Sequence, residues 1–480
     1  MRNWLLFAII LVFTLLVTMV VACPTPTTKL ERMASESLIC QIDFSSLVEY
    51  SFEASPDSQR VAYVAQAGDE QLVVIDGDEG KQYDEIGSLA FSPDSQRVAY
   101  RAREDDKEFM VIDGEEGKKY DAVGYPTFSP DSQRLAYVAQ AGDKEFMIVD
   151  GEEGKKYDGV SRRPIFSPDS QRLAYVAQAG DEDIVVIDGE EGKSYDYVYL
   201  IYLTFSPDSQ RVAHLAKAGD EWLVVVDGEE GEKYYFVDYP TFSPDSQRVA
   251  YAAQVRPSGE RYSWAIVIHE EEDLPWYGYY GEAATPKFSP DSQRLAFWAN
   301  DTFNWDEFFL VIDGEEWKWY TPDESIDYIS EIGCLFSPDS QHVAFTATID
   351  DKNIVVIDRN EGKQYDEVGY PIFSPDSQRV AYKAQKGDKW FVVVDGEEGK
   401  KYDYVSYLTF SADSQLIAYW AQAGDKEFVV ISGNEGGKYD SSDIKLGRGG
   451  VIFDSINGFD CLRYIAVKGD CVYSVMEIIE

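Results

Sequence analysis

The chain has 480 residues and carries 43 Lys and Arg against 87 Asp and Glu, for a formal net charge of −44. This charge disfavours nucleic acid as a partner, because phosphates are bound by basic side chains. Most of the acids lie in predicted turns, and we interpret them mainly as a device for solubility, with attraction of a cationic partner or a divalent metal as the alternative. No turn carries a D-x-D-x-D-G ladder, so we expect no dedicated metal site and no cofactor.

The N-terminus reads as an export signal. An apolar run extends from Trp4 to Ala22, and Cys23 follows it. The residues Val-Val-Ala-Cys resemble the bacterial lipobox, which predicts a signal peptide at residues 1–22 and lipidation of Cys23. The alternative is an uncleaved anchor helix, since the run is just long enough to span a bilayer. Both alternatives place the protein in the bacterial cell envelope, facing the periplasm or the exterior, on a polar tether at residues 23–36.

Residues 53–440 repeat one pattern ten times. The pattern centres on Ser-Pro-Asp-Ser, or Ser-Ala-Asp-Ser in the last copy, and its Asp returns at steps of 37 to 48 residues. These residues are Asp57, Asp94, Asp131, Asp169, Asp208, Asp245, Asp291, Asp339, Asp376 and Asp413. A period of this length is typical of repeat architectures, in which each copy is one supersecondary unit.

One copy predicts four short strands. Its segments "YPTFS", "RLAYVAQ" and "EFMIVD" are the first three strands, separated by a turn at "PDSQ" and a Gly-centred hairpin at "AGDK". We expect "GEEG" to turn the chain again and the Lys-containing "KKYDAV" to form an exposed outer strand. A four-stranded sheet with two apolar faces cannot bury both alone, and radial stacking of such sheets gives a β-propeller. Tyr137 is then expected to pack against a small Ala of a neighbouring blade, and the recurring Asp131 and Arg134 to serve the turn and blade edge.

The repeat also resembles a known family. The order Phe-Ser-Pro-Asp-Ser, Arg-Val/Leu-Ala-Tyr and Ile/Val-Val-Ile-Asp-Gly is similar to the WD40-like repeat of the Tol-Pal propeller protein and of prolyl oligopeptidase-like enzymes. That family usually has Gly after the Asp, whereas every copy here has Ser. The resemblance implies a propeller fold and no particular activity. The sequence shows no G-x-S-x-G nucleophile elbow.

The two ends of the chain complement each other. A degenerate last blade at 451–480 ends after its third strand, and residues 37–43 supply the missing fourth strand, so the propeller spans 37–480. We therefore predict an all-β propeller of about ten to eleven four-stranded blades, with one large ring favoured over two tandem propellers. Cys40 and Cys471 would lie on neighbouring strands of the closing blade, and a disulfide between them is one of the pairings open to the four remaining cysteines.

The sixth and seventh copies depart most from the repeat. Both carry long insertions, between 256 and 284 and between 300 and 333, and six of the ten tryptophans lie in these two copies. Aromatic residues on long loops of a rigid scaffold are a common way to build a binding site. The predicted ligand-binding residues are Trp264, Trp276, Tyr277, Tyr279, Tyr280, Trp305, Trp317 and Trp319. The alternative is that these loops pack on one another or fill the channel.

Three functions compete. The first is an envelope-anchored, non-enzymatic propeller that binds a protein, peptide or glycan. The second is a glycan-active enzyme that uses carboxylates such as Glu270, Glu271, Glu272 or Asp306, which would need a paired geometry. The third is a structural spacer. His214 replaces the core Tyr of its copy and is expected to be packed, and His269 and His342 show no metal-ligand pattern.

Overall fold

The computed structural model describes residues 32–43, 45–238, 240–255, 263–269, 277–280, 283, 286–301, 304–320, 334–349, 351–440, 452–456, 459–468 and 470–479. At 201, 277–279, 301, 304–307, 318–320, 440, 454–456 and 459–460 only the backbone is described. Across these residues the regular elements are strands, and no helix in this part of the chain is long and apolar enough to cross a membrane. The predicted signal peptide and Cys23 lie outside the described residues.

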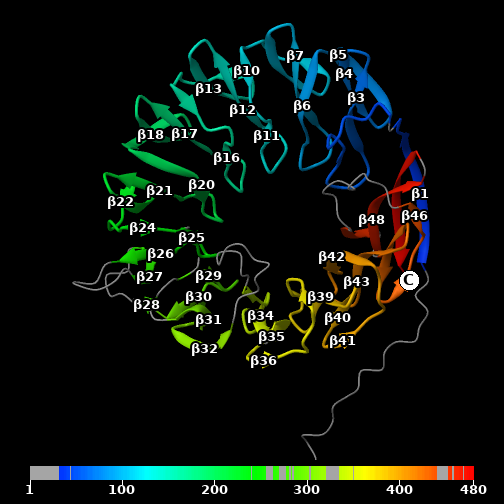
Figure 1. Ribbon diagram of the computed structural model, residues 1–480. Coiled ribbons are helices and arrows are strands. Elements are labelled where there is room, and N and C mark those ends of the chain that lie inside the picture. Colours follow the sequence, from blue (N-terminus) through cyan, green and yellow to red (C-terminus); the bar gives the residue numbers. More distant parts are fainter. Residues whose placement is uncertain are drawn as a thin grey trace, which may run out of the picture.

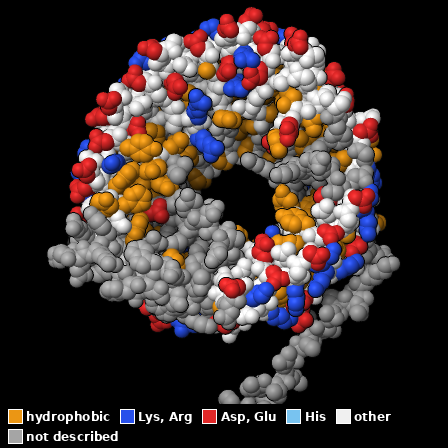
Figure 2. All heavy atoms as spheres, viewed as in Figure 1, with side chains coloured by type: hydrophobic (Ala, Val, Ile, Leu, Met, Phe, Trp, Pro, Cys, Tyr) orange, Lys and Arg blue, Asp and Glu red, His pale blue; other side chains and the backbone are white. Residues whose placement is uncertain are grey.

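The described strands form 11 sheets arranged in a single ring (Figure 1). The prediction of one large propeller of ten to eleven blades is thus confirmed. We number the blades 1 to 11 along the chain, with the N-terminal strand in blade 11. The space-filling view shows the ring open at its centre (Figure 2).

Blades 1 to 5 contain the first half of the repeats. Their strands are β2 (Glu53–Ala54), β3 (Val61–Ala67), β4 (Glu70–Ile75) and β5 (Asp78–Tyr83) in blade 1; β6 (Glu85–Phe91), β7 (Val98–Glu104), β8 (Lys107–Ile112) and β9 (Glu115–Glu116) in blade 2; β10 (Ala122–Val123), β11 (Thr127–Phe128), β12 (Leu135–Ala141), β13 (Lys144–Val149) and β14 (Glu152–Glu153) in blade 3; β15 (Gly159–Val160), β16 (Ile165–Phe166), β17 (Leu173–Ala179), β18 (Glu182–Ile187) and β19 (Glu190–Tyr195) in blade 4; and β20 (Tyr197–Phe205), β21 (Val212–Ala218), β22 (Glu221–Val226) and β23 (Glu229–Glu230) in blade 5.

Blades 6 to 11 complete the ring. Their strands are β24 (Phe236–Val237), β25 (Thr241–Phe242), β26 (Val249–Val255), β27 (Ser263–Ile268) and β28 (Tyr277–Tyr280) in blade 6; β29 (Lys287–Phe288), β30 (Leu295–Asp301), β31 (Asn304–Ile312) and β32 (Glu315–Tyr320) in blade 7; β33 (Leu335–Phe336), β34 (Val343–Ile349), β35 (Lys352–Ile357) and β36 (Asn360–Glu361) in blade 8; β37 (Glu367–Val368), β38 (Ile372–Phe373), β39 (Val380–Lys386), β40 (Lys389–Val394) and β41 (Glu397–Glu398) in blade 9; β42 (Tyr404–Phe410), β43 (Ile417–Ala423), β44 (Lys426–Ile431), β45 (Asn434–Glu435) and β46 (Tyr439–Asp440) in blade 10; and β47 (Ile452–Ile456), β48 (Phe459–Lys468), β49 (Cys471–Ile479) and β1 (Arg32–Gln41) in blade 11.

The turn after the third strand differs from the expected "GEEG". Asp150 and Gly151 form a two-residue turn with φ of 54° and 89°, and β14 already pairs with β13 directly after it. Positive φ at both central residues is the geometry of a type I′ turn, which favours Asp-Gly. The expected outer strand "KKYDAV" is divided between two blades. Tyr120 bridges back to β8 of blade 2, and β10 begins the inner strand of blade 3.

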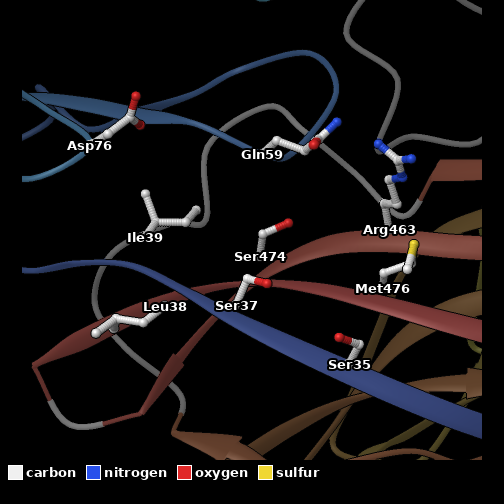
Figure 3. Close-up of a pocket in the computed structure, with 9 residues that line it drawn as sticks. All are labelled: Ser35, Ser37, Leu38, Ile39, Gln59, Asp76, Arg463, Ser474 and Met476. Carbon is white, nitrogen blue, oxygen red and sulfur yellow. The ribbon is translucent and has the colours of Figure 1, made fainter.

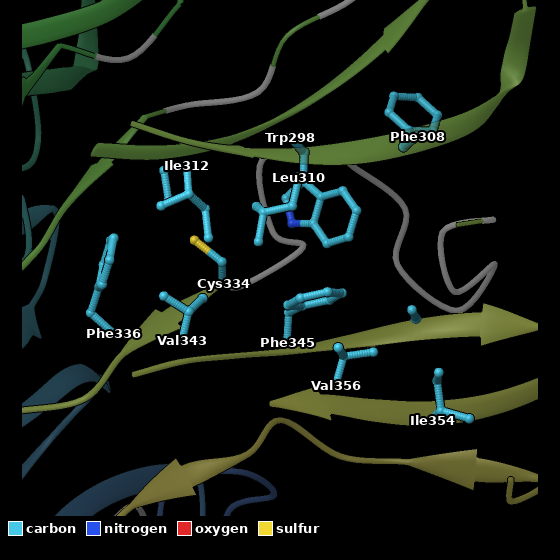
Figure 4. Close-up of a cluster of buried hydrophobic side chains, with 12 residues drawn as sticks. Trp298, Phe308, Leu310, Ile312, Cys334, Phe336, Val343, Phe345, Ile354 and Val356 are labelled. Atoms are coloured by element: carbon cyan, nitrogen blue, oxygen red, sulfur yellow. The ribbon is translucent and has the colours of Figure 1, made fainter. Parts of the chain in front are cut away.

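The hydrophobic core is divided among the seams between blades. Ala136 and Met147 of blade 3 lie in one buried cluster with Phe166 and Tyr175 of blade 4. In the seam between blades 7 and 8, Trp298 stacks edge-on against Phe345, with ring centroids 5.2 Å apart (Figure 4). Large rings from one blade thus fill the space over small residues of its neighbour, as the alternation of Tyr and Ala predicts.

The Ser that follows the Asp in each copy joins adjacent blades. Its backbone is left-handed, with φ of 66° at Ser170, a conformation that Gly adopts more readily. Its hydroxyl accepts a hydrogen bond from the Asp N–H of the preceding blade, 2.9 Å long between Asp131 N and Ser170 Oγ. Within the described residues this bond recurs at nine seams. This Ser therefore supplies one bond at each of these nine seams.

The recurring Arg crosses the same seams. Arg134 donates from Nε to Asp150 Oδ2 at 3.1 Å and from Nη1 to the carbonyl of Gln171 in blade 4 at 3.0 Å. Its guanidinium lies 5.2 Å from the ring centroid of Phe166, which also belongs to blade 4. The ion-pair partner of this Arg is thus the Asp of the Asp-Gly turn, and Asp131 is not its hydrogen-bond partner. Arg134 thus serves the blade edge, as the sequence predicts.

Asp131 instead orders its own turn. It accepts hydrogen bonds from the Ser129 hydroxyl at 2.6 Å and from the Gln133 N–H at 3.0 Å. These two donors lower the pKa of the Asp131 carboxyl. We call the end of each blade that carries these turns the SPDS end, and the opposite end, with the "AGDK" hairpins, the AGD end.

Blade 11 is closed by both ends of the chain. β1 pairs with β49 in antiparallel register, with Cys40 opposite Val472 and Gln41 opposite Cys471. Directly opposite residues share a face of the sheet, so the Cys40 and Cys471 side chains lie on opposite faces. Both thiols are free. The predicted disulfide would require this register to slip by one residue.

An ion pair ties the start of β1 to the ring. Arg32 donates from Nε to Glu477 Oε2 at 2.6 Å, and the Glu477 side chain is buried. Tyr464 donates its hydroxyl to the other oxygen of that carboxylate. In blade 10, Leu416 and Ser432 replace the recurring Arg and Asp of the SPDS end. Arg32 donates to the carbonyl of Asn434 in this blade, so it supplies a guanidinium near a seam that lacks the usual one.

Candidate functional site

A cluster of partly exposed aromatic side chains covers the AGD ends of blades 5 and 6. We call this cluster the aromatic platform, and its members are Tyr197, Tyr199, Tyr202, Trp222, Phe236 and Trp264. Hydrophobic side chains gather over these blades at the left of the ring (Figure 2). Tyr197 is 45% exposed, and the others are half-buried.

The rings of the platform form one continuous line. Tyr199 lies 5.3 Å from Trp222, Trp222 lies 5.7 Å from Phe236, and Phe236 lies 5.9 Å from Trp264, measured between ring centroids. The contact between Trp222 and Phe236 crosses the seam from blade 5 to blade 6. Tyr199 and Trp222 also pack on the buried core below, so the exposed rings rest on a rigid support.

Strand register explains why these residues meet. In blade 5, Tyr197 of β20 lies opposite Lys217 of β21, which lies opposite Trp222 of β22. In blade 6, Phe236 and Trp264 flank Gln254 in the same row. Cross-strand neighbours share a face, so each blade presents its row toward one side.

In blades 3 and 4 the third strand carries a carboxylate in this row, at Glu145 and Asp183. In blade 3 the row contains Ala122, Gln140 and Glu145. The Glu145 carboxylate accepts a hydrogen bond from the Val160 N–H of blade 4 at 2.8 Å, so the ordinary residue at the Trp222 position joins two blades. The aromatic residues of blades 5 and 6 therefore replace a structural contact with exposed ring surface.

Cationic and acidic groups accompany the platform. The Lys217 ammonium lies 5.6 Å from the Trp222 ring centroid, which is cation–π geometry. The pKa of the Tyr197 hydroxyl is raised by partial burial, by Tyr199 and by the nearby Asp183 carboxylate. The platform thus combines ring faces with negative charge at its edge.

The structure divides the predicted ligand-binding residues. Trp264 belongs to the platform. Tyr280 is buried between Phe297 and Phe309, and its ring is a core element of the seam between blades 6 and 7. Trp317 packs on the core of the next seam, and the guanidinium of Arg359 lies over its ring at 4.7 Å. Tyr280 and Trp317 are therefore placed as packing residues.

The structure does not describe the side chains of the remaining predicted residues. Trp276 lies outside the described residues, as do Glu270, Glu271 and Glu272. For Tyr277, Tyr279, Trp305, Asp306 and Trp319 only the backbone in β28, β31 and β32 is described.

The sequence interpretation missed Tyr197, Tyr199, Trp222 and Phe236. The sequence shows an exchange inside ordinary repeats: "WLVVVD" stands where other copies read "EFMIVD" or "DIVVID". The insertions of the sixth and seventh copies attracted attention because they hold more tryptophans.

A second candidate site is a hollow in the region where the two ends of the chain close the ring. It has a volume of about 390 Å³, and its lining is Ser35, Ser37, Leu38, Ile39, Gln59, Asp76, Arg463, Ser474 and Met476 (Figure 3). Asp76 is ion-paired with Arg60 at 2.8 Å, and Ser474 donates to the Ser58 carbonyl at 2.8 Å. This hollow has no aromatic lining, so the platform is the stronger candidate. Among the described residues, no group of three or more His, Cys, Asp or Glu could hold a metal ion.

Comparison with known proteins gives a fold likeness only. No protein-family model and no curated protein matches the chain. Solved structures that resemble it include TolB from Acinetobacter baumannii, 15% identical over 55% of this chain and 79% of that chain with a TM-score of 0.25. The β-propeller domain of the Trilobed protease from Pyrococcus furiosus is 13% identical over 58% of this chain and 94% of that chain, with a TM-score of 0.31.

Oligogalacturonate lyase from Vibrio parahaemolyticus is 11% identical over 74% of this chain and 96% of that chain, with a TM-score of 0.29. All these TM-scores lie below 0.5. The assignment of the chain as a β-propeller therefore rests on its own 11 sheets and on the Ser-x-Asp-Ser turn that recurs in blades 1 to 10.

Proposed function

We propose that the protein is a non-enzymatic binding module that recognises a polypeptide partner through the aromatic platform. The observation that carries this proposal is the continuous line of partly exposed rings across two adjacent blades. Aromatic rings give large contact area at low entropic cost and dominate protein interfaces. The platform departs from the repeat in both blades, so the fold alone does not require it.

The rigidity of the support favours recognition over packing. Val224 and Val237, which lie beneath the platform, are fully buried, and β21 and β22 of blade 5 pair without a break from Ala213–Val226 to Ala218–Glu221. A preformed surface loses little conformational entropy on binding. This arrangement suits a partner that docks on the AGD end without rearranging the ring.

The location of the module is part of the proposal. A lipid on Cys23 would tether the propeller to a bacterial envelope membrane, with its partner in the periplasm or outside the cell. The test is Cys23→Ser, which is expected to abolish labelling by a lipid precursor. Labelling that survives this substitution would contradict the anchor and leave the platform proposal untouched.

Photo-crosslinking in cells tests the platform. A benzoylphenylalanine at Tyr197 of the full-length chain is expected to give a polypeptide adduct, identified by mass spectrometry, that disappears when Trp222→Ala is added. The matched control is the same probe at Tyr50, which is 86% exposed in blade 1. Equal adducts at Tyr197 and Tyr50, an adduct that Trp222→Ala leaves unchanged, or an adduct with sugar alone would refute the proposal.

A further inference from the structure

The AGD ends of ordinary seams are closed by a lysine. The Lys of "AGDK" pairs with the Asp that begins the next blade, and at Lys144 and Asp158 Oδ1 the distance is 2.5 Å. The other oxygen of Asp158 accepts the Gly180 N–H of the next hairpin at 2.7 Å. The same ion pair occurs at Lys107–Asp121, Lys352–Asp366 and Lys389–Asp403.

The seam between blades 4 and 5 lacks this lysine. Glu182 stands at the Lys position, and Asp196 stands at the position of the Asp that begins the next blade. Asp196 Oδ2 accepts the Gly219 N–H at 2.5 Å, so the carboxylate is held as Asp158 is held. Its Oδ1 is then placed where the lysine binds at the ordinary seams. Within the described part of the chain no Lys or Arg forms an ion pair with Glu182 or Asp196.

This uncompensated carboxylate pair adjoins the aromatic platform. Tyr197 directly follows Asp196, and its ring lies 6.3 Å from Trp222. At the next seam the Lys position is again acidic, at Glu221. Lys217, stacked on Trp222, shows that these rings accept an ammonium group. Carboxylates beside exposed Tyr and Trp faces are complementary to a basic side chain, through charge and cation–π attraction together.

We propose that the platform binds a Lys- or Arg-containing segment of its partner, with one cationic group between Glu182 and Asp196 and its aliphatic stem over Tyr197 and Trp222. This inference rests on the proposed function and names the chemistry of the partner. The net charge of −44 supports it, because the field of the whole ring attracts a basic polypeptide and repels a second copy of this chain.

The chain contains its own matched control. In the seam between blades 1 and 2, Glu70 stands at the Lys position, and the Asp105 N–H donates to Asp84 as Gly219 does to Asp196. Glu85 and Glu108 occupy the Tyr197 and Trp222 positions there, and Arg101 lies near both. That seam therefore has the two carboxylates without the rings.

The test uses Glu182→Lys and Glu70→Lys in the full-length chain. Each restores the residue of ordinary copies and changes the net charge equally. The probe is a fluorescent octapeptide of alternating Lys and Gly, followed by anisotropy at low ionic strength. Glu182→Lys is expected to weaken binding about tenfold, and Glu70→Lys by less than about twofold, because one lost contact of about 1.4 kcal/mol corresponds to tenfold. Equal losses in the two variants, no binding of the probe, or equal binding of a Glu-Gly octapeptide would overturn the proposal.

Failure here is distinguishable from failure of the proposed function. If the Tyr197 photo-adduct depends on Trp222 and persists in Glu182→Lys, a polypeptide binds the platform without this basic contact, and only the present inference is wrong. If the adduct itself is absent or independent of Trp222, the proposed function is wrong. Loss of the adduct in Glu182→Lys but not in Glu70→Lys supports both.

Discussion

Two neighbouring seams of the ring have the same contacts at the SPDS end and different residues at the AGD end. At the SPDS end, the seams of blades 3–4 and 4–5 have the same serine bond, from Asp131 to Ser170 and from Asp169 to Ser209. At the AGD end, the first seam is closed by Lys144 and the second presents acids and aromatic rings. The SPDS end thus holds the ring together, and the AGD end is free to vary. In a repeat protein, the place in the blade at which a copy differs from the repeat therefore says more about function than the length of the inserted segment.

The difference extends into the core. In seam 3–4, Tyr157 of blade 3 meets Tyr175 of blade 4, whereas in seam 4–5 Tyr195 meets His214. A cavity of about 50 Å³ adjoins His214, and its Nε2 is buried without a hydrogen-bond partner among the described atoms. The packed histidine expected from the sequence is present, and its packing is looser than that of the tyrosine it replaces.

Changing this histidine is expected to have the largest effect. Burial lowers the pKa of His214 from 6.5 to about 4. Between these values the unfolded imidazole binds a proton and the folded one does not, so stability falls as the pH drops through this window. The loss is about 3 kcal/mol at pH 4 relative to pH 7. His214→Tyr, which restores the residue of most copies, should remove this part of the pH dependence.

Urea unfolding of both proteins at pH 4 to 7 measures the effect. The turn carboxylates are the same in both proteins, so their contribution cancels in the difference. Because the pKa values of Asp131-type groups are lowered, their stabilising effect is lost as the pH falls below the ordinary Asp value of about 4. The difference in unfolding free energy between the two proteins should therefore change across the window. A difference that stays constant with pH would show that His214 does not titrate as its burial requires.

Much of the ring could be predicted because it is repeated. Ten copies of one turn indicate a propeller, and a missing fourth strand at the C-terminus indicates closure by the N-terminus. β1 does run along β49, and it begins at Arg32, earlier than the expected residue 37. The start was missed because "RMASES" has the composition of a tether, and pairing with β49 outweighs its weak strand propensity.

The site was less predictable, for a physical reason. Tyr197, Trp222 and Phe236 are separated along the chain and become neighbours only through strand register and the seam between blades. The sequence did show that Glu182 stands where several other copies have Lys. The meaning of this exchange depends on knowing that the lysine at this position reaches the Asp of the next blade, which the repeat alone does not show.

A smaller effect is expected at the SPDS end. Ser170→Ala removes the hydroxyl that accepts the Asp131 N–H and keeps a Cβ in the left-handed conformation, so it should cost about 1 to 2 kcal/mol. Ser170→Gly loses the same bond and relieves the backbone, so its cost should be lower by about 1 kcal/mol. Thermal and urea unfolding of both variants check this order. Equal costs would mean that the left-handed backbone carries no strain at Ser170.

The smallest effect is expected from making seam 3–4 resemble seam 4–5 in charge alone. Lys144→Glu removes an exposed ion pair with Asp158 and creates a second pair of carboxylates without aromatic rings. Exposed pairs contribute little, so the melting temperature should barely change, and binding of the Lys-Gly octapeptide should stay within about twofold. Adding Gly159→Tyr and Asp183→Trp reproduces the Tyr197 and Trp222 positions, because Gly159, Gln178 and Asp183 form the corresponding row of blade 4. A Cβ at Gly159 meets only the flexible Gln178 side chain, 3.2 Å away, so the new Tyr can be accommodated. The triple variant should then bind a second octapeptide, with stoichiometry measured by calorimetry. A second site created by Lys144→Glu alone would show that charge without rings is sufficient, and the comparison between the two seams would lose its meaning.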